Sequence, residues 1–111
     1  MIEFETEVVS ERWAVIRPQG RLNLLAAPRL REVVAQCVGQ GRPHIVVDLS
    51  GTTFMDSSGL GALIAGLKTA RQAGGNLRIA ALNEQVQMVL ELTNLDRVLR
   101  PYPTVAEALS A

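Results

Sequence analysis

Two adjacent serines stand in the segment of this sequence best suited to chemistry, Asp56-Ser57-Ser58-Gly59. Apolar residues at helical spacing follow them, which places the serines in the first turn of a helix. A phosphate on such a serine faces free backbone N–H groups and the positive end of the helix dipole, and adds about −1.5 to −2 charges. Taken alone, the pattern is more typical of ordinary helix capping by Asp and Ser, and a regulatory phosphorylation site is the alternative.

The residues around the serines offer a surface to another protein. Gly59 and Gly61 would leave the backbone accessible, and Met55 and Leu60 could supply apolar contacts. The predicted partner-binding segment comprises Thr53, Met55, Asp56, Ser57, Ser58, Gly59 and Leu60.

Enzymatic use of these serines is not predicted. An esterase nucleophile needs Gly-x-Ser-x-Gly, and neither serine has a glycine two residues before it. His44 stands at the far end of the preceding predicted strand, about 16 Å from Leu49 at about 3.3 Å per residue, and so is not expected to reach Ser58 as a base. One Cys and one His do not make a metal site, and no phosphate-binding loop with its lysine is present. We expect a binding protein that is not an enzyme and holds no metal or cofactor.

Hydrophobic periodicity predicts the elements that position this segment. Alternation over residues 2–8 and an apolar stretch at 13–17 predict an antiparallel hairpin, which Gly20 would end. The other predicted elements are strands at 45–49, 77–82 and 98–102 and helices at 25–40, 57–73, 83–94 and from Thr104 onward.

The order ββαβαβαβα predicts one α/β domain over residues 1–111. Its sheet would be mixed but mostly parallel, with about five strands, an N-terminal antiparallel hairpin and about four helices. In such sheets, sites lie beyond the carboxyl ends of the strands. The loop from strand 45–49 into helix 57–73 occupies such a place.

Composition narrows the classes of partner. Lys plus Arg and Asp plus Glu each number 11, so the formal net charge is zero. Binding to a nucleic-acid backbone needs a basic excess, so no nucleic-acid partner is expected. The longest run without polar side chains, residues 59–67, is too short to cross a bilayer, and no membrane insertion is expected.

The lone cysteine and the first residues of the chain indicate in which cellular compartment the protein works. The lone Cys37 falls on the predicted buried face of helix 25–40 and cannot form an internal disulfide, which suits a reducing cytoplasm. The chain starts with acidic residues where a signal peptide would be basic. We therefore expect a cytoplasmic protein.

Several motifs together resemble the STAS family, specifically the bacterial anti-sigma-factor antagonists. The resemblance covers nearly the whole chain, and its most specific part is the segment that contains both serines. The motifs are Gly20-Arg21-Leu22-Asn23, Ala27-Pro28-Arg29-Leu30, Ile45-Val46-Val47-Asp48-Leu49, Phe54-Met55-Asp56-Ser57-Ser58-Gly59-Leu60-Gly61, Leu92-Thr93-Asn94-Leu95-Asp96 and Tyr102-Pro103-Thr104.

The resemblance implies a function and a role for one serine. In that family the second serine of the motif accepts the phosphate, which here is Ser58, and Ser57 is the alternative acceptor. The unphosphorylated form binds an anti-sigma factor that is also a serine kinase, and so frees the sigma factor. Phosphorylation ends the complex and a serine phosphatase resets the switch. We expect the free chain to be a monomer.

One departure from the family pattern concerns the predicted partner surface. Family members often carry Gly-Glu-Leu-Asp, whereas this chain has Arg21 and Asn23 in place of the two acids. We expect both residues to contribute to partner binding, with Arg21 meeting an acidic partner or pairing with the phosphate; a solvated arginine in a turn is the alternative for Arg21. The alternative function is a STAS scaffold or accessory subunit, in a stress-signalling assembly or a lipid transporter, that Ser58 does not switch.

Overall fold

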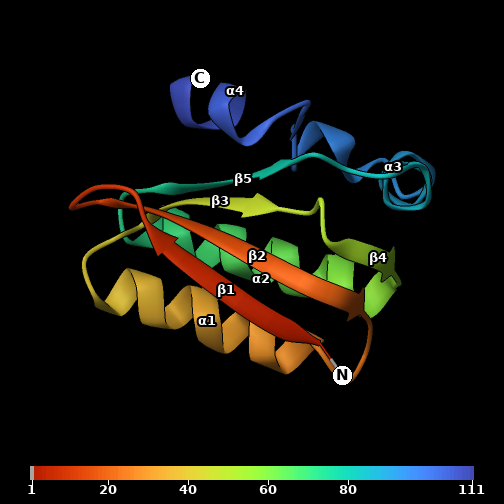
Figure 1. Cartoon of the computed structure of the whole chain (residues 1–111), viewed down its shortest axis with the longest axis horizontal. Helices are drawn as coiled ribbons and strands as arrows, with labels where there is room; N and C mark the ends of the chain where they lie inside the picture. The colour runs from red at the N-terminus through yellow and green to blue at the C-terminus, as the bar shows by residue number, and fades with distance from the viewer. Residues whose placement is uncertain (1) are drawn as a thin grey trace.

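The computed structural model describes residues 2–111, which form a mixed sheet with helices on both faces (Figure 1). The strands are β1 (Glu3–Val8), β2 (Trp13–Leu22), β3 (His44–Asp48), β4 (Thr52–Met55), β5 (Asn76–Ala80) and β6 (Pro101–Tyr102). The helices are α1 (Ala27–Gly39), α2 (Ser57–Gln72), α3 (Glu84–Leu92) and α4 (Val105–Ser110), with a 3₁₀ turn, η1, at Leu95–Arg97.

The strand order confirms the predicted α/β class with its antiparallel first pair. The strands lie in the order β1-β2-β3-β5-β6, and β4 pairs with β2 outside this path. The β1–β2 pair is antiparallel, and all other pairs are parallel. The sheet therefore has six strands instead of about five, and the added strand is β4.

β4 forms because β2 continues beyond its predicted end, and the added residues of β2 provide a strand with which β4 can pair. Gly20 does not end β2; it takes a positive φ of 118°, and the pairing register shifts between Gly20 and Arg21. The first half of β2 pairs with β3, and its last residues pair with Thr52, Phe54 and Met55. A glycine bend thus carries one strand from one partner to the next.

The predicted helix boundaries hold to within a few residues, and polar caps explain most of them. Asn83 and Thr104 accept from the N–H three residues on and so begin α3 and α4. Gly74, with φ 85°, follows the end of α2. The last strand is shorter than predicted, because the chain after the left-handed Asn94 first forms η1 and reaches the sheet only at Pro101.

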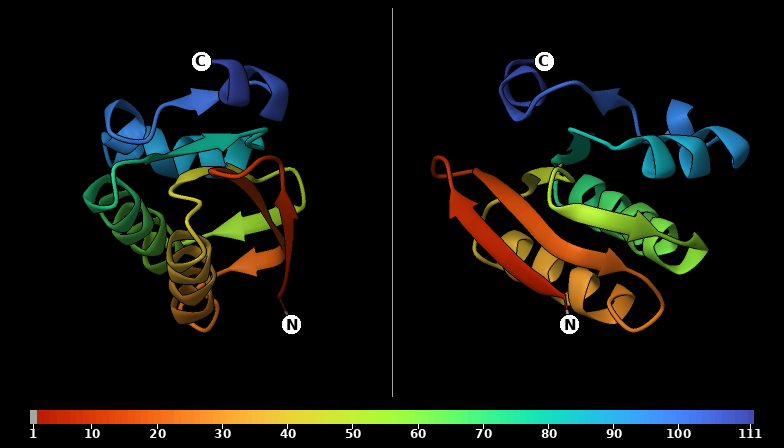
Figure 2. Two further views of the ribbon diagram at one scale, coloured as in Figure 1. Left: turned by 90° about the vertical axis from the view of Figure 1, so that its left-hand side faces the viewer. Right: turned by 45° about the vertical axis from the view of Figure 1, so that its right-hand side comes forward.

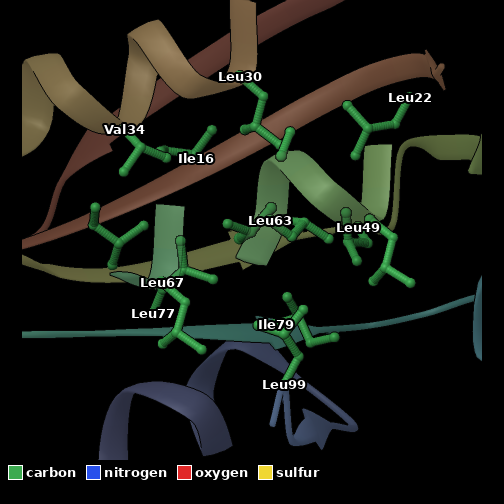
Figure 3. Packing of buried hydrophobic residues seen from close by; sticks show 14 of the residues in the cluster. Ile16, Leu22, Leu30, Val34, Leu49, Leu63, Leu67, Leu77, Ile79 and Leu99 are labelled. Atoms are coloured by element: carbon green, nitrogen blue, oxygen red, sulfur yellow. The ribbon is translucent and has the colours of Figure 1, made fainter. Parts of the chain in front are cut away.

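The main core lies between one face of the sheet and the pair α1 and α2, which lie together on that face (Figure 2). Alternate residues of the strands point into it, and leucines of both helices meet them (Figure 3). The buried set shown there includes Ile16, Leu22, Leu30, Val34, Leu49, Leu63, Leu67, Leu77, Ile79 and Leu99.

A smaller cluster and a row of charges occupy the opposite face. Ala108 of α4 packs with Val15 and Val46 in this cluster. Beside it Arg17 pairs with Glu7 at 2.8 Å and with the buried Asp48 at 3.2 Å. Partial burial lowers the pKa of Arg17, but the hydrogen bond and charge of Glu7, followed by those of Asp48, raise it, and the net shift is upward.

Leu63 provides a test of this core. Leu63→Ala should lower the free energy of unfolding by about 2–5 kcal/mol, because it opens a cavity at a fully buried site. Leu25→Ala is the matched control, since Leu25 is 83% exposed; it should change the free energy by no more than about 0.5 kcal/mol. Urea unfolding followed by circular dichroism measures both, and similar losses in the two variants would contradict this packing.

Candidate partner-binding site

Asp56 sets the start of α2 and with it the position of both serines. Its side-chain Oδ1 accepts from the Gly59 N–H at 3.0 Å, and its carbonyl accepts from the Leu60 N–H at 3.0 Å. Ser57 and Ser58 are therefore the first two residues of the helix, as the sequence predicted. Within residues 2–111 neither hydroxyl has a hydrogen-bond partner. Capping thus belongs to Asp56 and leaves both serine hydroxyls available.

β4, which leads into α2, is held on its other side by polar side chains from the start of α3. The Gln85 amide accepts from the Met55 N–H and donates to the Met55 carbonyl, both at 2.9 Å. Asn83 donates to the Thr52 carbonyl at 3.0 Å. These contacts satisfy strand groups that would otherwise be left without a partner. They fix the segment before the serines, and the sequence pattern gave no sign of them.

Three residues predicted to contact a partner are buried, and that prediction is corrected. Met55 and Leu60 are 0% and 2% exposed and belong to the main core. Gly59 is also buried, and a Cβ on it would lie 2.1 Å from the Leu22 carbonyl oxygen. Gly59 therefore permits close packing of α2 on the end of β2 and does not offer its backbone to another protein.

Ser57 and Ser58 do reach the surface. Ser57 is exposed, Ser58 is half-buried, and both line a groove of about 270 Å³ between the first turns of α1 and α2. The lining residues are Leu24, Ala27, Pro28, Arg31, Ser57, Ser58 and Gly61. Thr53 is exposed and Asp56 half-buried on the approach to this groove.

Arg21 does not line the groove that holds the serines. Its neighbour Leu22 points into the core beside α2, and successive strand residues point to opposite faces. The Arg21 guanidinium lies 4.2 Å from the centre of the Phe54 ring, on its paired strand. Arg21 lines a different hollow of about 580 Å³ together with Arg29. This placement does not support pairing of Arg21 with a phosphate on either serine.

Asn23 shapes the loop between β2 and α1. Its side-chain oxygen accepts from the N–H groups of Leu25 and Ala26, at 3.1 and 3.2 Å. The loop held in this way leaves Leu24 69% and Leu25 83% exposed. Leu24 lines the groove that holds the serines, whereas Leu25 lines the hollow that holds Arg21. The sequence did carry a sign of these exposed residues, because Leu24 and Leu25 are adjacent leucines between the end of a strand and the regularly spaced apolar residues of α1.

The other chemistry-bearing side chains lie away from the serines. His44, the first residue of β3, stacks on Trp13 with ring centres 4.8 Å apart. Burial raises the pKa of the Cys37 thiol, an effect that the charge of Arg42 partly offsets. A buried thiol with a raised pKa is a poor nucleophile. Over residues 2–111 no three His, Cys, Asp or Glu side chains gather as metal ligands. In the same range no helix has both the length and the apolar character to cross a membrane.

The fold and the site define a small α/β domain that presents two serines at a helix start beside an apolar loop. Residues 4–108 match the STAS domain, and the chain belongs to this family. The match covers every strand and helix except the first residue of β1 and the last two residues of α4.

Relatives within the family are similar over most of their length. A Thermotoga maritima protein provisionally named an anti-sigma factor antagonist is 33% identical over 96 residues, 86% of this chain and 85% of that protein. The crystal structure of an anti-sigma factor antagonist from Mycobacterium paratuberculosis has a TM-score of 0.87 at 27% identity, covering 99% of this chain and 92% of that one. SpoIIAA shares the fold at 24% identity in its unphosphorylated and phosphorylated forms, with TM-scores of 0.82 and 0.74 and at least 96% of this chain and 93% of that chain covered.

Two glycines of α2 provide a matched test of how this site is built. Gly59→Ala should lower the free energy of unfolding by about 1–3 kcal/mol or more, because the new Cβ overlaps the Leu22 carbonyl. Gly61→Ala should raise it by up to about 1 kcal/mol, since a Cβ there meets nothing within 4 Å and alanine favours the helix. Urea unfolding measures the free energy of unfolding of both variants. Equal effects at the two positions would contradict the close contact between Gly59 and the Leu22 carbonyl.

Proposed function

We propose that this chain is an anti-sigma factor antagonist that works as a phosphorylation switch in the cytoplasm. Its unphosphorylated form binds an anti-sigma factor with serine kinase activity and so releases a sigma factor. Phosphorylation of Ser58 ends the complex, and a serine phosphatase restores the binding form. The protein is a monomer when free, and it binds its partner without catalysing a reaction.

The observation that carries the proposal is the groove in which Ser57 and Ser58 meet the exposed loop leucine Leu24. Burial of an exposed apolar side chain against a partner stabilises the complex. A serine in the same groove lets one modification alter that surface. The names of the relatives in Thermotoga maritima and Mycobacterium paratuberculosis support the same class of function. SpoIIAA, which shares the fold, has been solved in phosphorylated form.

The phosphoryl transfer takes place at the Ser58 hydroxyl oxygen. This oxygen attacks the γ-phosphorus of ATP bound by the kinase, the hydroxyl proton is lost, and ADP leaves. Ser58 is the second residue of α2 and half-buried, so the kinase must reach into the groove. Ser57 lies one residue earlier and is more exposed, which makes it the acceptor to test against Ser58.

A capture experiment from native lysate tests the switch. Wild type and Ser58→Ala should capture a protein with a serine kinase domain, and Ser58→Asp should lose it, because the added charge stands in the groove. Ser10→Asp is the matched control and should retain the partner, because Ser10 is exposed in the connection between β1 and β2 and does not line the groove. Reaction of the recovered pair with ATP should place the phosphate on Ser58, as read by peptide mass spectrometry.

Two outcomes would overturn the switch. If wild type, Ser58→Ala and Ser58→Asp all capture the same assembly, the chain is a scaffold or accessory subunit that Ser58 does not control. If the phosphate appears on Ser57 alone, the acceptor is misassigned.

The exposed leucines give a second test of the same surface. Leu24→Ser should weaken binding of the captured kinase by about tenfold or more, since fully burying a leucine side chain contributes about 1.5–3 kcal/mol. Leu92→Ser is the matched control, because Leu92 is 76% exposed at the far end of α3. Calorimetry with the purified partner measures both affinities. Equal affinities for the two variants would remove Leu24 from the interface.

A further inference from the structure

The groove beside Ser58 has room for a phosphate group. It encloses about 270 Å³, and Gly61 forms part of its wall. Gly61 follows Ser58 by three residues and so lies on the same face of α2. Because a Cβ on Gly61 would meet nothing within 4 Å, the space beside the Ser58 side chain is open. A phosphate on Ser58 can therefore enter the groove without displacing a side chain of α2.

A phosphate on Ser58 would be electrostatically unfavourable in the groove unless a cationic side chain lies near it. Asp56 is two residues from Ser58, and its carboxylate already occupies the N–H of Gly59 in the first turn. A phosphate dianion would stand close to that carboxylate, and like charges at such a separation repel. The positive end of the α2 dipole offsets only part of this repulsion.

Arg31 is the cationic side chain that lines the groove. It lies in the first turns of α1, one helical turn after Ala27, which lines the same wall. Arg31 is exposed, and within residues 2–111 its guanidinium has no ion pair or hydrogen bond to hold it elsewhere. Arg21 and Arg29 line the other hollow, and Arg29 already donates to the Ile2 carbonyl at 2.9 Å.

We propose that Arg31 binds the phosphate of phosphorylated Ser58 across this groove. The inference rests on the proposed function, which assigns the phosphate to Ser58. A guanidinium fork matches two phosphate oxygens, so the pair bridges the first turns of α1 and α2. Phosphorylation then fills the groove and turns Arg31 away from an incoming partner. The negative charge of the phosphate weakens binding of a partner that contacts this groove. The partner also loses its contact with Arg31, which is now paired with the phosphate.

The titration of the phosphate itself tests the pair. Phosphoserine is incorporated at position 58 during translation, so no kinase is needed, and ³¹P NMR follows its second pKa between about pH 4 and 8. A nearby cation favours the dianion and lowers this pKa. Arg31→Gln should therefore raise it by about 0.5 pKa unit, as expected for a partly exposed pair. Arg31→Lys should retain part of the effect, and Arg29→Gln is the matched control that should leave the pKa unchanged.

The titration tests the Arg31–phosphate pair separately from the proposed phosphorylation switch. If Arg31→Gln leaves the phosphate pKa at its wild-type value, or if Arg29→Gln raises it as much, the pairing is overturned. The capture experiment with Ser58→Asp would still stand, because it does not depend on Arg31. A difference between wild type and Arg31→Gln that disappears in 1 M salt, where the screening length is about 3 Å, supports a direct charge pair.

Discussion

The site depends on one close contact between the start of α2 and the end of β2. The Leu22 carbonyl oxygen lies 2.1 Å from the place where a side chain on Gly59 would begin. The Asp56 N–H approaches the same oxygen at 3.4 Å. A helix start and a strand end that meet at one carbonyl cannot separate without losing core packing. The positions of Ser57 and Ser58 in the first turn of the helix follow from this contact.

Most of the fold could be predicted because its elements carry clear periodicity and clear end signals. The four helices were found from apolar spacing and from caps such as Asn83 and Thr104, and the hairpin from alternation along the chain. β4 was missed because Thr52–Met55 is a four-residue segment between a turn and a cap, too short for a pattern. Its partner was hidden too, since Gly20 reads as a strand end and is in fact a bend inside β2.

The candidate site was only partly predictable for a similar reason. The motif placed Ser57 and Ser58 at a helix start, because capping chemistry is local in sequence. It could not tell buried from exposed apolar neighbours, since that depends on β2 and α3, which pack against the segment from elsewhere in the chain. Met55 therefore proved to be core, and Leu24, from a loop about thirty residues earlier, is exposed in the groove. Arg31 entered the site for the same tertiary reason.

Folding and the proposed switch use opposite sides of the same helical turn. The Gly59 backbone faces Leu22 and the core, whereas the side chains of Ser57 and Ser58 face the groove. Among residues 2–111 no hydrogen bond ends on the Ser58 hydroxyl, so a phosphate there breaks no internal bond. Its effect is confined to the charge and shape of the groove. A partner packed over Leu24 would have to remove water from a dianion, which costs several kcal/mol unless the charge is paired. Such a modification can end a complex while the core beneath it stays intact.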